Sequence, residues 1–230
     1  MIEDYPLNLS PNLRDPDQII AFLISFVVAI TIHEVMHAWT AYKLGDSTAR
    51  DLGRITLNPL MHFDPIGFFG MAMISIGFPF IGWGKPVPVN PSRFTHSFAR
   101  HRKRGMALVA FAGPLSNVAQ ALIVAIPIQL ALRGQIELGS QTAMMLETFM
   151  LVNVLLASFN MIPIPPLDGH KILMGILPDF WRPVLAPLEQ YGFMVLLLLF
   201  FVGGQLGGSL VNGIMIPVRQ LILDAVHIGL

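Results

Sequence analysis

Residues 19–39, IIAFLISFVVAITIHEVMHAW, place two histidines and a glutamate at the end of a long apolar run. The first twelve residues of this stretch carry no charge. A helix that crosses a lipid bilayer needs about 20 mostly apolar residues. The stretch therefore predicts a membrane-spanning helix. Its ionisable end requires an explanation, because such groups are costly at membrane depth and rarely persist without a function.

The composition indicates an integral membrane protein. Of the 230 residues, 54% are hydrophobic and only 12% are charged, whereas a soluble domain carries roughly a quarter charged residues. The formal net charge is zero, so nothing in the bulk charge favours a nucleic-acid partner. The sequence contains no cysteine, which excludes disulfides, thiolate metal ligands and cysteine nucleophiles.

The hydropathy pattern predicts an all-α polytopic membrane domain over residues 19–230, preceded by a polar extracytoplasmic segment, residues 1–18. Four segments have the length of membrane spans: residues 19–44, 105–132, 143–160 and 191–212. Residues 65–84 are also apolar, but they contain several glycines and have basic residues on both sides. We therefore expect a re-entrant, membrane-dipping hairpin there, with a further membrane span as the alternative. An interfacial helix is compatible with residues 214–228.

The positions of lysine and arginine predict the orientation. Eleven of the fourteen lie on the side of the loops that follow the first and third spans, and three lie on the other side. Because positively charged loops stay in the cytoplasm, we expect a multi-pass protein of the cell (inner) membrane with its N-terminus outside. His33 then lies about 21 Å along the first span, on the cytoplasmic side of the bilayer midplane.

The stretch HEVMH, residues 33–37, predicts a metal site. His33 and His37 are four residues apart, so on a helix they share one face and can hold one zinc ion from the same side. Glu34 lies beside the first histidine, where it could take a proton from water at the metal. This is the H-E-x-x-H arrangement of metal-dependent peptidases.

A catalytic zinc ion usually takes a third protein ligand, and Asp168 is a better candidate than the histidines at 62, 96, 101 and 227. It lies in NMIPIPPLDGH, residues 160–170, whose three prolines must break the third span. We expect Gly169 to permit an unusual backbone angle there. A carboxylate on a broken helix at the end of a span can then turn inward to the metal.

Three blocks together resemble the site-2 proteases, intramembrane zinc metalloproteases of the M50 type. They are HEVMH at 33–37, AGPLSN at 112–117 and NMIPIPPLDG at 160–169, and they occur in the family's order. The resemblance implies one zinc ion per chain, with His33, His37 and Asp168 as ligands and Glu34 as the general base. It also implies a substrate that is itself the transmembrane segment of a membrane protein.

The resemblance further implies that Asn117, and by a similar placement Asn160, lie near the substrate or the transition state. A hydrogen bond between helices is the alternative for each asparagine. The sequence has no evident PDZ or CBS domain. We therefore expect the size filter or ligand sensor that such domains provide to be absent or to be supplied by a membrane partner.

The segment KPVPVNP, residues 85–91, predicts a surface for an unwound substrate. In an extended chain Pro86 and Pro88 remove the donors from one edge, whereas Val87 and Val89 keep theirs on the other. Such an edge can bind a substrate peptide as an added β-strand. A linker that packs on the helix bundle is an equally good interpretation.

The sequence thus predicts a zinc metalloendopeptidase that hydrolyses a peptide bond within or near a partner's transmembrane helix, in regulated intramembrane proteolysis. Two other classes stay open. An ion- or proton-coupled transporter could use His33, Glu34 and Asp168 as its pathway, although this does not explain their zinc-peptidase spacing. An inactive scaffold could bind transmembrane helices, but it would have no need of Glu34.

Overall fold

The computed structural model describes residues 15–75, 82–201 and 217, and within them the chain is helical with no β-strand. The α-helices are α1 (Pro16–Lys43), α2 (Thr48–Asp51), α3 (Pro65–Ser75), α4 (Arg102–Leu132), α5 (Ser140–Asn160), α6 (Asp168–Ile176) and α7 (Arg182–Phe201). Short 3-10 turns lie at Pro59–Met61, Pro91–Arg93, His96–Ala99 and Asp179–Trp181. The described part of the chain confirms the predicted all-helical class.

Three of these helices, α1, α4 and α5, are long and apolar enough to cross a membrane, with 28, 31 and 21 residues. Each begins three residues before the predicted span (16 against 19, 102 against 105, 140 against 143). The first does so because the side chain of Asp15 accepts a hydrogen bond from the Asp17 N–H and Pro16 occupies the first turn. Hydropathy alone does not detect such polar helix starts.

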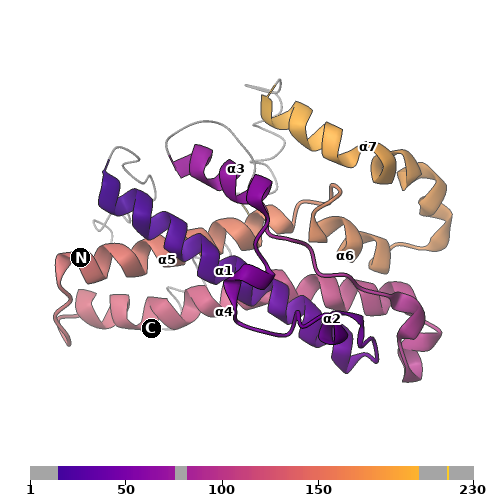
Figure 1. Cartoon of the computed structure of the whole chain (residues 1–230), viewed down its shortest axis with the longest axis horizontal. Coiled ribbons are helices and arrows are strands. Elements are labelled where there is room, and N and C mark those ends of the chain that lie inside the picture. Colours follow the sequence, from indigo (N-terminus) through magenta and orange to yellow (C-terminus); the bar gives the residue numbers. More distant parts are fainter. Residues whose placement is uncertain (1–14, 76–81, 202–216, 218–230) are drawn as a thin grey trace.

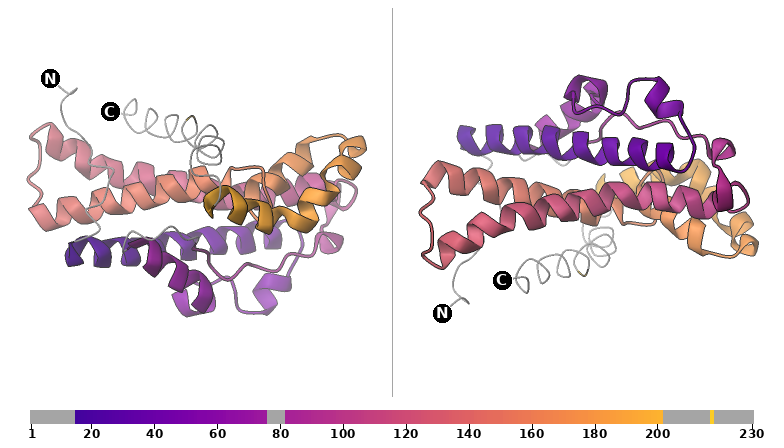
Figure 2. Two further views of the ribbon diagram at one scale, coloured as in Figure 1. Left: turned by 90° about the horizontal axis from the view of Figure 1, so that it is seen from above. Right: turned by 90° about the horizontal axis from the view of Figure 1, so that it is seen from below.

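Helix α4 lies at the centre of the bundle, where it packs against α1, α5 and α6 (Figures 1 and 2). The contact between α4 and α5 is built from a row of small and medium side chains: Ala121, Ala125, Ile128, Met150, Val154 and Ala157. Small residues let two helices approach closely. In a membrane this close packing replaces the hydrophobic effect, which needs water, as the force that holds the helices together. The two helices therefore lie close together, and so do the polar groups between them.

The outward face of α1 is apolar. Ile20, Ile24 and Val28 are 54%, 49% and 41% exposed, and their spacing of four residues places them in one stripe along the helix. Helix α4 has a similar outward face that includes Ile123 and Ile126. Exposed apolar stripes on long helices suit contact with lipid hydrocarbon rather than with water.

The fourth predicted span differs from the helix that is observed. Helix α7 begins at Arg182, nine residues before the predicted start at residue 191, and its apolar part within the described residues is Pro183–Leu198. Residues 202–212 and, except for residue 217, the interfacial helix expected at 214–228 lie outside the described residues. A fourth span and that interfacial helix therefore stay predictions.

The apolar segment 65–84 starts with α3, whose Met71 packs against Phe22 and Phe26 of α1. The 11 residues of α3 span about 17 Å, which is too short to cross a hydrocarbon core of about 30 Å. Residues 76–81 lie outside the described residues, so the membrane-dipping hairpin stays a prediction.

The predicted break after the third long helix is confirmed. Helix α5 ends at Asn160, the proline-rich loop contains a cis peptide bond between Pro165 and Pro166, and α6 begins at Asp168. The expectation of an unusual backbone angle at Gly169 is wrong, since this glycine is not among those with positive φ. A Cβ at Gly169 would instead lie 2.5 Å from the carbonyl oxygen of Ile162, so glycine is required because the chain turns back tightly there.

Candidate metal centre

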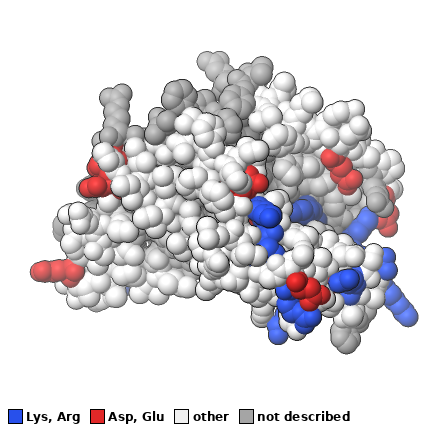
Figure 3. All heavy atoms as spheres, in the orientation of Figure 1, with Lys and Arg blue, Asp and Glu red and all other residues white. Residues whose placement is uncertain are grey.

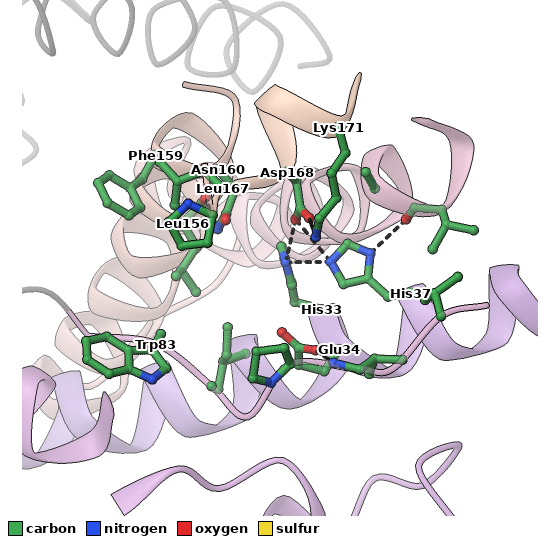
Figure 4. A pocket seen from close by; sticks show the side chains of 18 of the residues that line it. His33, Glu34, His37, Trp83, Leu156, Phe159, Asn160, Leu167, Asp168 and Lys171 are labelled. Atoms are coloured by element: carbon green, nitrogen blue, oxygen red, sulfur yellow. Dashed lines mark hydrogen bonds and ion pairs between the residues drawn. The ribbon is translucent and has the colours of Figure 1, made fainter. Parts of the chain in front are cut away.

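His33 and His37 point from α1 toward Asp168, the first residue of α6 (Figure 4). The Nε2 atoms of the two histidines are 2.9 Å apart. Oδ2 of Asp168 lies 3.2 Å from Nε2 of His33 and 3.0 Å from Nε2 of His37. All three residues are buried. The structure thus brings the three predicted ligands together into one group that can hold a metal ion.

The geometry of this triangle fits a tetrahedral metal ion. Ligand atoms at about 2.0–2.1 Å from a zinc ion lie about 3.3 Å from one another, close to the observed separations. Nδ1 of His37 donates a hydrogen bond to the carbonyl oxygen of Val109 at 2.7 Å. Because a carbonyl oxygen can only accept, the Nε2 atom of a neutral His37 carries a lone pair directed at the triangle. Converging lone pairs repel unless a cation lies between them.

Gly113 of α4 leaves the room that the two histidine rings occupy. A Cβ at this position would lie 2.5 Å from Nε2 of His37 and 2.6 Å from Cε1 of His33. The AGPLSN block therefore contributes to the site through the absence of a side chain as well as through Asn117.

A cavity of about 290 Å³ opens beside the cluster, and its lining includes all four residues of the predicted zinc chemistry together with Val87, Val89 and Asn160. Glu34 is buried, and its carboxylate faces this cavity beside His33 (Figure 4). The backbone N–H of Val87 donates a hydrogen bond to Oε2 of Glu34 at 3.0 Å. The segment of residues 85–91 is thus in direct contact with Glu34, the predicted general base.

The two asparagines occupy different positions. Asn160 lines the cavity, and its Nδ2 donates to the Leu156 carbonyl of its own helix at 3.0 Å. Asn117 is not among the residues that line the cavity, and its place near the substrate or the transition state stays a prediction. Its Oδ1 atom accepts a hydrogen bond from Nδ1 of His33 at 2.6 Å, behind the ring as seen from the cavity. This contact is a hydrogen bond between helices, the alternative that the sequence also allows for Asn117.

The segment that carries Val87 and Val89 is anchored from the loop after α2. The buried guanidinium of Arg54 donates to the carbonyl oxygens of Lys85 and Pro86, at 2.5 and 3.2 Å. Burial lowers the pKa of Arg54, partly offset by the charge of Glu34. In a regular strand the carbonyl groups of neighbouring residues point to opposite edges. Arg54 binds the carbonyls of two neighbouring residues, so the segment departs from regular strand geometry. No strand is present in the described residues.

Two further polar groups complete this anchor. The Asn90 N–H donates to Oδ2 of Asp46 at 2.6 Å, and the Lys85 N–H donates to the carbonyl oxygen of His62 at 2.8 Å. Burial lowers the pKa of His62, which favours its neutral form beside Arg54. The segment is therefore held at both ends and in its middle.

Sequence reasoning missed four residues that organise the site. Arg54 and Asp46 anchor residues 85–91. Both are distant from that segment in the sequence, so no sequence pattern indicated the contacts. Lys171 lies 3.2 Å from Oδ1 of Asp168, and its i+3 spacing at a helix start could have revealed it. Asn153 is a polar residue inside a predicted span, which is a recognised sign of function.

Comparisons with known proteins agree with this geometry. The family model for peptidase family M50 matches residues 124–203, which include Asp168. The chain is 39% identical over 201 residues to "Putative zinc metalloprotease YwhC" of Bacillus subtilis strain 168, covering 85% of this chain and 83% of that protein. The chain belongs to peptidase family M50. This confirms the resemblance to the site-2 proteases.

Less similar relatives match a somewhat shorter length of the chain. The protein Rip2 of Mycolicibacterium smegmatis, which has the same description as YwhC, is 28% identical over 181 residues, covering 78% of this chain and 66% of Rip2. Rip2 of Mycobacterium tuberculosis is 29% identical over 178 residues, covering 77% of this chain and 65% of Rip2. No solved structure matches the chain.

The replacement Gly113→Ala tests the metal cluster. The added methyl group would displace both imidazole rings, so we expect bound Zn²⁺ in the purified chain to fall with an affinity loss of at least about tenfold, as for other disturbed ligand shells. The measurement is Zn²⁺ per chain after dialysis against a weak chelator. Gly139→Ala is the matched control, because no atom lies within 4 Å of its Cβ position. Full Zn²⁺ retention by Gly113→Ala would contradict the assigned cluster.

Proposed function

We propose that this M50 peptidase is an intramembrane zinc endopeptidase, which hydrolyses a peptide bond within or near the transmembrane helix of a membrane protein in regulated intramembrane proteolysis. The observation that carries the proposal is the location of the metal-binding group. Its two histidines lie on an apolar helix long enough to cross a membrane, and the group borders a cavity that Glu34 also lines.

The cofactor is one Zn²⁺ ion per chain, and in this proposal His33, His37 and Asp168 hold it. When bound, zinc supplies a Lewis acid that lowers the pKa of water at the site to about 7 and polarises the scissile carbonyl. Glu34 is the general base, which takes the proton of the attacking water and returns it to the leaving amine. The Val87 N–H holds one oxygen of this carboxylate and leaves the other for the proton.

The site lies toward the cytoplasmic side of the cell membrane in this proposal, with the N-terminus outside. Figure 3 shows lysine and arginine side chains gathered at the end of the molecule where α2 lies. Positively charged termini of spans stay in the cytoplasm. His33 comes 17 residues after Pro16 (33 minus 16), or about 26 Å along α1, which is most of the way through a core of about 30 Å.

A substrate helix must unwind before cleavage, because its own hydrogen bonds shield each peptide bond. We assign the binding of the unwound strand to the backbone of Val87 and Val89, which line the cavity. Because the Val87 N–H is bonded to Glu34, the donor on this edge is the Val89 N–H. Arg54 and Asp46 hold the segment from outside the cavity, so its backbone is pre-organised for a partner. Asn160 is assigned to the same substrate groove, and a partner membrane protein is the expected source of regulation.

The replacement Glu34→Gln tests the proposed chemistry. Glutamine keeps the shape and can still accept the Val87 N–H, but it cannot take a proton, so we expect bound Zn²⁺ to stay while cleavage falls by at least 10²-fold. The assay follows membrane proteins that accumulate when the wild type is replaced by the variant in the native cell. Unchanged cleavage by the variant would contradict the general base. Ion flux through liposomes that survives chelation would favour a transporter instead.

The replacement Val89→Pro tests the strand-binding edge. Proline removes the Val89 N–H and leaves the Val87–Glu34 hydrogen bond in place, so we expect normal Zn²⁺ content with cleavage reduced about tenfold, as for one lost backbone hydrogen bond. Val89→Ala is the matched control, since it trims the side chain but keeps the donor. Equal cleavage by both variants would show that this N–H does not bind the substrate.

A further inference from the structure

A row of buried amides connects helix α5 to the metal cluster. Nδ2 of Asn153 donates to the carbonyl oxygen of Phe149 at 2.9 Å, and Nδ2 of Asn117 donates to Oδ1 of Asn153 at 2.8 Å. Oδ1 of Asn117 then accepts from Nδ1 of His33 at 2.6 Å. Both asparagine side chains are completely buried. The row therefore crosses from α5 through α4 to α1 at the depth of the metal ligands.

The Phe149 carbonyl at the end of this row fixes the direction of every hydrogen bond in it. The Phe149 carbonyl can only accept, so the NH₂ group of Asn153 must face it and Oδ1 must face Asn117. The NH₂ group of Asn117 therefore faces Asn153, and it also donates to the Ala29 carbonyl at 3.4 Å. Oδ1 of Asn117 is left to accept from His33, whose Nδ1 atom must carry the hydrogen.

This direction decides which nitrogen of His33 can bind a metal. A neutral imidazole has one N–H and one lone pair. With the hydrogen held at Nδ1, the lone pair lies at Nε2, the atom that faces Asp168 and His37. If the Asn117 amide were reversed, its NH₂ group would face Nδ1 and favour the opposite form, with a hydrogen directed into the metal position.

We propose that Asn153 is a positioning residue of the zinc site, which acts through Asn117 to hold His33 in its metal-binding form. The inference rests on the proposed role of His33 as a zinc ligand. The partner of a metal-bound histidine commonly sets its ring orientation and basicity, and its loss weakens metal binding by about 10–100-fold. Asn153 contacts Asn117, which in turn contacts His33. It therefore contributes to metal binding by fixing the orientation of the Asn117 amide.

Simple helix packing does not require this arrangement. Ser158 is an equally buried polar residue on α5, and its hydroxyl donates to the Val154 carbonyl of its own helix. It is not part of the row to the metal. Ser158→Ala is therefore the matched control, because it removes a buried hydrogen bond from the same helix without affecting the orientation of Asn117.

The test measures the Zn²⁺ dissociation constant of the detergent-solubilised full chain by competition with a chelator. We expect Asn117→Ala to bind about 10–100-fold more weakly and Asn153→Ala about tenfold more weakly, with Ser158→Ala unchanged. Asn153→Asp should restore binding, because a buried neutral carboxyl supplies the same donor to Phe149 and the same acceptor to Asn117. Asn153→Leu, of similar volume, replaces the alanine variant if that chain does not fold.

The double variant separates positioning from general destabilisation. Since Asn153 acts through Asn117, adding Asn153→Ala to Asn117→Ala should cause no further loss of affinity. Wild-type affinity in Asn153→Ala and Asn153→Leu, or losses that multiply in the double variant, would overturn the proposal. Retention of Zn²⁺ by His33→Ala would instead contradict the ligand set, and with it the proposed function.

Discussion

The approach of Asp168 to His33 and His37 is the constraint on which the rest of the structure depends. The histidines are fixed on a long helix, so the carboxylate must be brought to them by a change in chain direction. The end of α5 at Asn160 and the tight turn at Gly169 supply that change. A carboxylate and two imidazoles at about 3 Å in an apolar bundle need either a metal ion or a proton on an imidazole between them.

Most buried polar groups near this cluster can be understood as partners of it. Val109 and Asn117 hold the outer nitrogens of the two histidines, and Lys171 lies on the outer oxygen of Asp168. Because water is scarce between membrane helices, each such group needs a protein partner. In the proposed zinc site the ligands are therefore oriented before a metal ion binds, and Val87 lines the cavity beside them.

The sequence predicted the parts of this site that depend on spacing along one helix or on the termination of a helix. His33, Glu34 and His37 follow from helix periodicity, and Asp168 follows from the prolines that end α5. The direction of Asn117 could not be predicted, because it depends on which helices surround α4. Arg54 and Asp46 were missed for the same reason, since their contacts lie 31 to 44 residues away. The starts of α1, α4 and α5 were misplaced because polar or charged residues form the first turn of each helix.

X-ray absorption at the zinc edge of the purified chain tests the central claim most directly. We expect one zinc ion with nitrogen and oxygen neighbours at about 2.0–2.1 Å, with the outer-shell scattering of two imidazole rings, and one imidazole fewer in His37→Ala. A spectrum with no imidazole scattering, or one that is the same in His33→Ala and His37→Ala as in the wild type, would contradict it.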